Sequence, residues 1–291
     1  MHTKLQNRLA NGSVLRQRYK IIKLISDRSS FGITYLAEDL DLPENHQCVV
    51  KHLKHNNADS RVIEIANRLF EEESKHLHKL SEHDQIPRLY ARFEEDKEFY
   101  LVQEYIKGKD LCSEIRNGKL WTEENTIKYL KEILNVLDFI HRKKIIHRDI
   151  KPDNIIRRQC DRKLVLIDFG AVKEINNTAI NIQGQQQLTV AIGPNYMPEE
   201  QRRGMPVLAS DIYSVGVIAI WGLTGSPNVV GWANCSNIEV SDRLIKILNK
   251  MTDSDHRRRY QNACEALNAI DKTITNSITP STIWEKFKAW W

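Results

Sequence analysis

His147-Arg148-Asp149-Ile150-Lys151-Pro152-Asp153-Asn154, followed farther along by Asp168-Phe169-Gly170, is the part of the sequence that decides the fold. Short β-like runs flank Asp149 and Asp168, so we expect each acidic side chain in a loop beside a strand. Asn154 and Asp168 supply an amide and a carboxylate oxygen, which are the hard donors that Mg²⁺ prefers. Asp149 supplies a second carboxylate, which can accept a proton.

The residues before this pair of loops are rich in predicted strands. Their β-branched and aromatic runs, separated by polar turns, predict a small antiparallel sheet, and a stretch with near-helical apolar spacing predicts one amphipathic helix. We expect the strands at Tyr19–Ile25, Phe31–Glu38, Cys48–Leu53, Arg88–Phe93 and Glu98–Tyr105, and the helix at Arg61–Leu80.

The residues around and after the loops are rich in predicted helices. Thr122 is a suitable N-cap for a helix, because Glu123 and Glu124 then occupy its first turn. Further helices are expected at Asp211–Leu223 and Asp242–Met251. The sequence therefore predicts a strand-rich half followed by a helix-rich half.

The composition excludes several classes of protein. A chain of 291 residues with 41% hydrophobic and 28% charged residues is an ordinary globular protein. Its apolar runs are too short for a membrane helix and residues 1–18 lack a secretory core, so we expect no membrane span and a cytoplasmic location. Five scattered cysteines predict neither disulfides nor a zinc site, and the net charge of +5 favours no nucleic-acid partner.

The two loops resemble the catalytic loop and the magnesium loop of eukaryotic-type Ser/Thr protein kinases. This resemblance implies an α+β fold with two lobes, in which an antiparallel sheet and one helix form the N-lobe and helices form most of the C-lobe. The lobes would span residues 19–105 and 106–271, after a polar arm at 1–18 and before a linker and aromatic tail at 272–291.

Other stretches extend the resemblance over most of the chain. Lys51 at the end of a predicted strand and Glu73 in the predicted helix resemble the family's Lys–Glu pair, which implies that the two are in contact. Glu200, Asp211 and Arg259 resemble residues that distinguish protein kinases from small-molecule kinases of related architecture, with Glu200 paired to Arg259. Stretches such as Tyr196-Met197-Pro198 resemble bacterial, particularly cyanobacterial, members.

The resemblance implies transfer of the γ-phosphate of ATP to a protein hydroxyl, with Mg²⁺ as the metal and Mn²⁺ as an alternative. Asp149 would be the base, and Lys151 would contact the transferring phosphate and favours Ser or Thr acceptors over Tyr. Asn154 and Asp168 would hold the metal, while Lys51, held by Glu73, would bind the α and β phosphates.

The resemblance also places the nucleotide between the two halves. We expect contacts to adenine above and below the ring, at its back wall and from the main chain, as well as contacts to the ribose and the phosphates. Val49 and Thr34 would lie above the ring and Ile156 below it, with Gln103 at the back wall and Glu104 and Ile106 as main-chain partners. Asp110 would contact the ribose, and the phosphates would be contacted by Ser29, Ser30 and Gly32.

Two departures from the family pattern leave a second function open. The phosphate-covering loop, Asp27-Arg28-Ser29-Ser30-Phe31-Gly32, keeps only the last of three glycines, and Asp27 would repel phosphates if it faced them. Gly193 stands before Pro194 where the family has a hydroxyl residue. The first hypothesis is an active Ser/Thr protein kinase, and the alternative is a pseudokinase that works by binding.

Regulation and partners follow from the same resemblance. Arg148 beside Asp149 would clamp a phosphorylated activation segment, with Thr178 and Thr189 as acceptors, or would only brace the loop. The partner is a protein with a Ser or Thr acceptor, and autophosphorylation is a further expectation. The histidines of the first half, including His52 and His76, lack ligand spacing and are expected at the surface.

Overall fold

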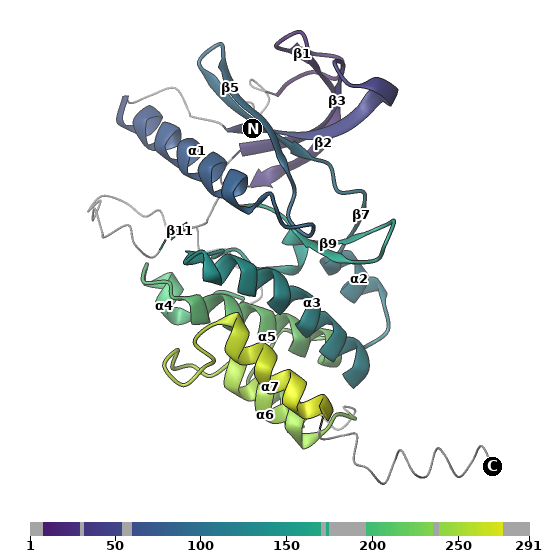
Figure 1. Ribbon diagram of the computed structural model, residues 1–291, viewed down its shortest axis with the longest axis vertical. Coiled ribbons are helices and arrows are strands. Elements are labelled where there is room, and N and C mark those ends of the chain that lie inside the picture. The colour runs from purple at the N-terminus through teal and green to yellow at the C-terminus, as the bar shows by residue number, and fades with distance from the viewer. Residues whose placement is uncertain are drawn as a thin grey trace, which may run out of the picture. The chain divides into compact units, whose positions relative to one another are not determined.

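The computed structural model of the chain describes residues 8–29, 32–53, 60–169, 173–174, 196–234 and 239–275. Contacts group the chain into a sheet unit, residues 1–107 with 167–170, and a helical unit, residues 108–166 with 171–291. Figure 1 shows the strands of the first unit with helix α1, and the helices of the second. Within residues 167–170, Asp168 forms an ion pair with Lys51 of the same unit.

A six-stranded antiparallel sheet forms the sheet unit, in the order β1-β2-β3-β4-β6-β5. All five predicted strands are confirmed, with ends that differ by a few residues. The strands are β1 Val14–Leu15, β2 Tyr19–Ser29, β3 Gly32–Asp39, β4 His46–Leu53, β5 Leu89–Glu95 and β6 Glu98–Glu104. Helix α1 spans Ser60–Leu80, and a short 3-10 turn, η1, spans Pro43–Asn45.

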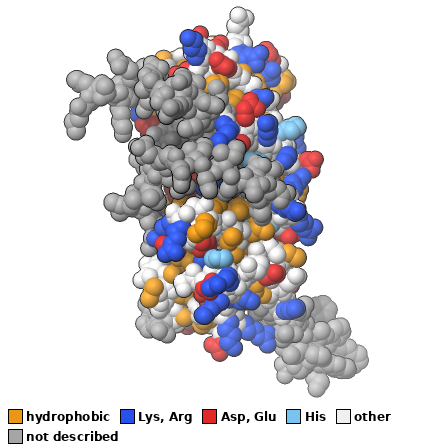
Figure 2. Space-filling view, turned by 90° about the vertical axis from the view of Figure 1, so that its left-hand side faces the viewer, with side chains coloured by type: hydrophobic (Ala, Val, Ile, Leu, Met, Phe, Trp, Pro, Cys, Tyr) orange, Lys and Arg blue, Asp and Glu red, His pale blue; other side chains and the backbone are white. Residues whose placement is uncertain are grey.

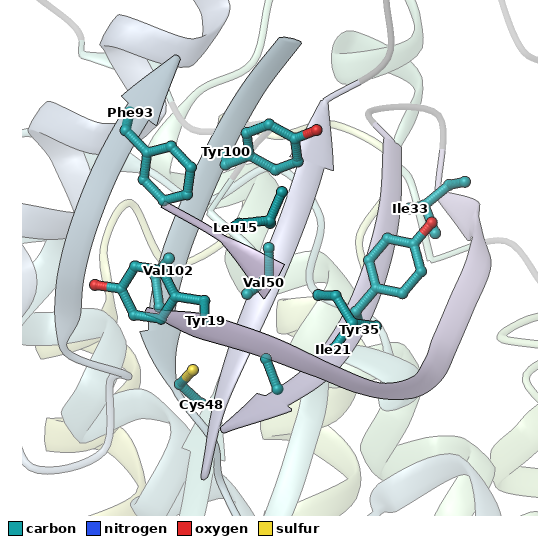
Figure 3. Packing of buried hydrophobic residues seen from close by; sticks show 11 residues of the cluster. Leu15, Tyr19, Ile21, Ile33, Tyr35, Cys48, Val50, Phe93, Tyr100 and Val102 are labelled. Carbon is teal, nitrogen blue, oxygen red and sulfur yellow. The ribbon is translucent and has the colours of Figure 1, made fainter. Parts of the chain in front are cut away.

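One face of this sheet is lined by apolar and aromatic side chains that pack together. Alternation along each strand brings Tyr35, Val50 and Val102 to this face, where they join the buried cluster of Figure 3. The rings of Tyr19 on β2 and Phe93 on β5 stack with centroids 5.8 Å apart. Because β2 and β5 lie far apart in the strand order, this contact requires the sheet to curl around its core.

The opposite face of the sheet carries Lys51 and receives helix α1. Leu53 and Leu101 share this face with Lys51, and both belong to a cluster that includes Phe70 of α1. Phe70 and Phe99 contact each other with ring centroids 5.2 Å apart. This packing fixes α1 beside the strand that holds Lys51.

Part of the segment predicted as a polar arm is built into the sheet unit. Strand β1 pairs with β2, and Leu15 is buried in the core. Arg18 donates two hydrogen bonds to the carboxylate of Asp39, at 2.7 and 2.8 Å, and these bonds hold the pKa of that buried carboxyl below its usual value. The polar composition hid this structure, because backbone pairing and one apolar anchor suffice to hold the segment.

The helical unit contains the predicted helices and several short strands. Its helices are α2 Leu111–Asn117, α3 Glu123–Arg142, α4 Glu199–Arg202, α5 Leu208–Thr224, α6 Asp242–Met251 and α7 Ala263–Thr275, with 3-10 turns η2 Pro152–Asn154 and η3 Trp232–Asn234. Its strands form sheets in the orders β10-β9-β7 and β11-β8. They are β7 Gly108–Asp110, β8 Ile145–Ile146, β9 Ile155–Arg158, β10 Leu164–Leu166 and β11 Lys173–Glu174.

Helix α5 is the centre of the helical unit, because every residue from Ala209 to Leu223 is buried. Helices α3, α6 and α7 pack around it. The predicted cap of α3 is confirmed, since the hydroxyl of Thr122 accepts a hydrogen bond from the amide of Asn125 at 3.2 Å. At the C-terminal end of α5, Gly225 adopts a left-handed conformation and terminates the helix.

A buried ion pair connects α4 to the segment before α7. Arg259 donates to both carboxylate oxygens of Glu200, at 2.7 and 3.2 Å, and Ser210 donates to the same carboxylate at 2.7 Å. Arg259 also stacks over the ring of Tyr213, 4.7 Å from its centroid. The pairing of Glu200 with Arg259 predicted from the sequence is confirmed.

The surface prediction for two of the histidines was wrong. His52 and His76 are 3% and 5% exposed. His52 stacks on Tyr100 and lies 3.0 Å from the carboxylate of Glu98, so a polar partner and an aromatic contact compensate its burial. The sequence pattern did not reveal that β4 buries this position.

Charges are spread over the molecule. On the face shown in Figure 2, basic and acidic side chains are interspersed. Among the helices that the described residues form, none is both long enough and apolar enough to cross a membrane.

Replacing Arg259 with Met should lower the free energy of unfolding by about 3–5 kcal/mol, because the carboxylate of Glu200 would stay buried without its partner. The measurement is the urea midpoint of the full chain. The matched control is Arg257→Met, since the Arg257 side chain is 79% exposed and forms a surface ion pair with Asp255. Equal shifts of the midpoint in the two variants would contradict the importance of the buried pair.

Acid should weaken the same interaction. Burial tends to raise the pKa of Glu200, but Arg259 and Ser210 outweigh burial, so the pKa lies below its ordinary value of 4.5. A carboxyl with a lowered folded pKa contributes stability that is complete above its unfolded pKa and is lost as the pH falls through the folded value. The stability difference between the wild type and Glu200→Gln should therefore be constant above roughly pH 6 and shrink below about pH 4.5. Urea titrations at several pH values, with exposed Glu199→Gln as control, test this, and a difference that grows with acid would refute it.

Candidate active site

Three charged side chains from distant parts of the sequence meet in the sheet unit. The ammonium of Lys51 on β4 lies 2.8 Å from Oε1 of Glu73 on α1 and 2.7 Å from Oδ1 of Asp168. The contact between Lys51 and Glu73 predicted from the sequence is confirmed. Helix α1 supplies the Glu73 carboxylate because its apolar side packs against the same face of the sheet.

The electrostatics of this cluster keep Lys51 charged. Burial alone would lower the pKa of Lys51, since it penalises the ammonium form, but the charges of Asp168 and Glu73 outweigh burial and raise the pKa well above its ordinary value. The side chain of Lys51 is only 15% exposed. A permanently charged, desolvated ammonium beside two carboxylates is suited to bind phosphate oxygens.

Several residues expected at the nucleotide lie on the same sheet face as Lys51. Directly opposed residues in antiparallel strands share a face, and Lys51 is opposite Thr34 while Val49 is opposite Gln103. Residues two apart on one strand also share a face, so Val49 and Lys51 connect the two pairs. Val49 and Gln103 are buried. These four expected contacts therefore form one continuous surface of the sheet unit.

Gly32 is required by the sheet itself. Its φ of +145° lies in a range that other residues rarely adopt, and a Cβ at this position would be 2.1 Å from the carbonyl oxygen of His52. The single glycine retained in the loop is thus needed for the close approach of β3 to β4. Its amide lies at the start of β3.

The two residues whose main chain is expected to contact adenine lie at the end of β6 and just after it. Glu104 is its last residue, and its amide donates to the carbonyl of Arg88 at 2.9 Å while its carboxylate accepts from the amide of Arg88 at 3.2 Å. Ile106 is buried just beyond the strand. The sheet unit therefore positions both residues.

In the helical unit, a second cluster forms around Asp149. Its Oδ2 accepts hydrogen bonds from the ammonium of Lys151 at 2.7 Å and from Nδ2 of Asn154 at 2.8 Å. Nδ2 of Asn154 also donates to the carbonyl oxygen of Asp149 at 3.0 Å. Both amide hydrogens of Asn154 are thereby used, so its side-chain oxygen remains as the acceptor that a metal would require.

Asp211 in the middle of α5 holds the loop that carries Asp149. Its two carboxylate oxygens accept hydrogen bonds from the backbone amides of His147 and Arg148, at 2.8 and 2.9 Å. It also accepts from Nε2 of His141 at 3.1 Å, while Nδ1 of His141 accepts from the amide of Ala263 at 3.2 Å. His141 is therefore a neutral donor to Asp211 in this network.

Arg148 is held in place by its backbone. It adopts a positive φ of 69°, and its carbonyl oxygen accepts a hydrogen bond from the side chain of Gln201 in α4. Burial lowers the pKa of its guanidinium, and Asp211 acts in the opposite direction. Its buried Nε has no hydrogen-bond partner among the described residues.

Asp110 has a structural role in addition to the one expected. As the N-cap of α2 it accepts from the amide of Ser113 at 2.7 Å and from the Ser113 hydroxyl at 2.8 Å. It is paired with Ile156 across β7 and β9, so these two expected nucleotide contacts are neighbours in the helical unit. Each carboxylate oxygen keeps a second lone pair for a ribose hydroxyl.

Some predicted positions lie outside the residues that the structure describes. These are Ser30, Thr178, Thr189, Gly193 and the aromatic tail from residue 276, and of Ser29 only the backbone at the end of β2 is described. Their expected roles stay predictions.

The side chains that could hold a metal are oxygen donors of the kind that Mg²⁺ prefers. Within the described ranges, no group of three or more His, Cys, Asp or Glu side chains is arranged to bind a metal ion. Mg²⁺ does not need such a group, because it usually binds through one or two side chains together with phosphates and water. A carboxylate at Asp168 and an amide oxygen at Asn154 fit that donor set.

Sequence reasoning did not assign a site role to His141 or Gln201, and it used Asp211 only as a family marker. The signal for Asp211 was present, since one carboxylate stands in an otherwise apolar helix. A buried carboxylate requires hydrogen-bond donors, and the nearest orphan donors are backbone amides of a loop. No sequence feature identifies which loop supplies them.

Comparisons with known proteins give consistent matches. The protein kinase domain family matches residues 30–278. Serine/threonine-protein kinase B of Synechocystis sp. is 41% identical over 276 residues, covering 90% of this chain and 47% of that protein. Serine/threonine-protein kinase PknA of Nostoc sp. is 38% identical over 275 residues, covering 90% and 48%. The chain thus spans about half the length of the curated relatives it matches.

A solved structure supports the fold. The kinase domain of PknI from Mycobacterium tuberculosis matches with a TM-score of 0.65 at 18% identity, covering 91% of this chain and 99% of that chain. The fold class predicted from the sequence is confirmed.

Replacing Asp211 with Asn should destabilise the helical unit by about 2–4 kcal/mol, because an amide nitrogen would face one of the backbone donors and leave it buried without an acceptor. Hydrogen exchange should also become faster at the amides of His147 and Arg148. The matched control is Asp271→Asn, whose carboxylate is 58% exposed in a surface pair with Lys131. Unchanged exchange at the two amides would show that Asp211 does not hold the loop.

Proposed function

Because the chain belongs to the protein kinase domain family, we propose that it is a Ser/Thr protein kinase that transfers the γ-phosphate of ATP to protein hydroxyls. The observation that best supports this proposal is the position of the Lys51 ammonium between two carboxylates. Its Nζ lies 2.8 Å from Oε1 of Glu73 and 2.7 Å from Oδ1 of Asp168. Phosphoryl transfer requires positioned charge more than covalent chemistry from the protein, and this cluster supplies positioned charge. Glu73 holds the lysine, and Lys51 binds the α and β phosphates.

Asp149 acts as the base in this proposal. Its carboxylate accepts a hydrogen bond from Lys151 at 2.7 Å, so a substrate hydroxyl that replaces or joins this bond lies within reach of both side chains. Asp149 orients the hydroxyl and accepts its proton. Lys151 then neutralises charge on the transferring phosphate. A lysine at this position favours Ser and Thr acceptors.

The metal is assigned to Asn154 and Asp168. Mg²⁺, or Mn²⁺ in its place, neutralises charge on the phosphates when it is bound. Asn154 contributes an amide oxygen and Asp168 a carboxylate, and both are already oriented by the bonds to Asp149 and Lys51.

The nucleotide contacts are proposed on the surfaces described above. Thr34, Val49 and Gln103 share the sheet face with Lys51 and would contact adenine from one side, and Ile156 from the other. The main chain of Glu104 and Ile106 would bind the edge of the ring, and Asp110 the ribose. Ser29, Ser30 and Gly32 would cover the phosphates.

The physiological substrate and partners are also part of the proposal. The two curated relatives are named serine/threonine-protein kinases, which supports a protein with a Ser or Thr acceptor as the partner of this chain. Autophosphorylation is proposed for the segment that contains Thr178 and Thr189. The pseudokinase alternative gains no support from the described residues, because Lys51, Glu73, Asp149, Asn154 and Asp168 are all present.

The activity should depend on the charged residues in a specific way. With ATP, Mg²⁺ and a generic Ser/Thr-containing protein, Asp149→Asn and Asp168→Ala should each lower the rate by at least about 10²-fold, since proton transfer and charge neutralisation each contribute that much. The matched control is Asp153→Asn, an exposed acid in the same loop that should stay active. Urea midpoints close to that of the wild type ensure that the variants are folded. A wild type no more active than Asp149→Asn would leave the pseudokinase as the correct assignment.

Arg148 should matter only when the protein is phosphorylated. A half-buried guanidinium is suited to bind a phosphate with two hydrogen bonds, so Arg148→Gln should abolish the gain in activity that follows incubation with ATP and leave the unphosphorylated enzyme unchanged. Phosphopeptide mapping should find the modification at Thr178 or Thr189. An active preparation without phosphate in this segment would contradict this regulation.

A further inference from the structure

The β2–β3 hairpin carries an acidic residue where the kinase family has a glycine. Asp27 stands at the first glycine position and Ser29 at the second, and Ser29 pairs with Gly32 across the tip. Irregularities in the pairing of β2 and β3 occur on either side of Ser26. An external contact can help to fix the position of a hairpin with these irregularities and with a negative charge near its tip.

Arg8 provides that contact. Its guanidinium forms an ion pair with the carboxylate of Asp27, and the two side chains are 39% and 38% exposed. The next residue, Leu9, donates its amide to the hydroxyl of Tyr35 on β3 at 3.0 Å. Two consecutive residues before the sheet therefore hold both strands of the hairpin.

The segment that carries Arg8 is itself anchored. The amide of Gly12 donates to the carbonyl of Ile21 at 2.8 Å, and the amide of Ile21 donates to the carbonyl of Ser13 at the same distance. The side chain of Leu15 is buried in the core. The segment that follows Arg8 is thus bonded to β2 and packed into the core.

The ion pair also keeps the carboxylate of Asp27 away from the Lys51 face. Ser26 is opposite Thr34, which shares that face with Lys51. Tyr35 belongs to the opposite, core face, and both Arg8 and Asp27 lie close enough to influence the pKa of its hydroxyl. Asp27 therefore lies on the Tyr35 side of the hairpin, where it does not face the proposed phosphates.

We propose that Arg8 is a positioning residue for nucleotide binding: its ion pair with Asp27 fixes the β2–β3 hairpin and holds the Asp27 carboxylate away from the phosphates of ATP. The proposal rests on the proposed kinase function. It assigns to residues 8–18 the task that backbone flexibility performs in a glycine-rich loop, because the hairpin is placed by a side-chain contact instead of adapting through glycines.

The test is a double-mutant cycle on the KM for ATP in the full chain. Arg8→Gln and Asp27→Asn should each raise the KM about two- to fivefold, the range that corresponds to one exposed ion pair, with kcat unchanged. The double variant should be no worse than either single variant, because each removes the same contact. Arg8→Lys should restore part of the affinity. The matched control is Lys131→Gln, which breaks a surface pair with Asp271 in the helical unit and should leave the KM unchanged.

Three results would overturn the proposal. A lower KM in Asp27→Asn would mean that the carboxylate acts directly on the phosphates, and additive effects in the double variant would mean that Arg8 and Asp27 act independently. An increase in KM with a matching loss of urea stability would likewise assign Arg8 a merely structural role.

A second measurement separates this proposal from the proposed function. Hydrogen exchange at the β2–β3 amides needs neither ATP nor activity, and it should be about two- to fivefold faster in Arg8→Gln while the amides of α1 stay unchanged. Unchanged exchange in the hairpin would refute the brace even in an active enzyme. A wild type that binds no ATP, tested by calorimetry, would instead refute the proposed function and with it the effect on affinity.

Discussion

The ammonium of Lys51 between two carboxylates is the interaction on which the sheet unit depends. It joins a strand, a helix and the segment around Asp168, which are separated by long stretches of sequence. Removing charges from water is costly, so the side chains of Lys51 and Glu73, which are 15% and 3% exposed, require opposite partners at hydrogen-bond distance. Helix α1 must therefore pack against the Lys51 face, and Phe70 supplies the apolar contact that holds it there.

The helical unit uses the same device with backbone groups as partners. Asp211 lies in a helix that is buried over almost its whole length, and its carboxylate is compensated by amides of the loop before Asp149 and by His141. Loop conformation is thus fixed by a rigid element rather than by the loop's own sequence. Arg148, with its positive φ, is stable in that conformation because its amide and carbonyl are both bonded. As a result, Asp149 is held in one position and hydrogen-bonded to Lys151 and Asn154.

Periodicity and motif spacing predicted most of this architecture. The five expected strands and the expected helices α1, α3, α5 and α6 are all present. The contacts of Lys51 with Glu73 and of Glu200 with Arg259 follow from the motifs. What the sequence could not supply depends on partners that lie far away along the chain. The sequence around His52 predicts a surface residue, because it does not show that Tyr100 and Glu98 lie beside it in the fold. The segment around Leu15 was predicted to be a polar arm, because the sequence does not show that it pairs with the edge of β2.

Asp27 illustrates the same limit from the opposite direction. Taken alone, an acidic residue in a phosphate-covering loop argues against nucleotide binding, because like charges repel. The ion pair with Arg8 weakens that argument, because it gives the Asp27 carboxylate a cationic partner near Tyr35, which lies on the core face of the sheet. A motif that has lost its glycines has therefore not necessarily lost its function. Under the role proposed for Arg8, the segment before β1 supplies the positioning that a glycine backbone supplies elsewhere in the family.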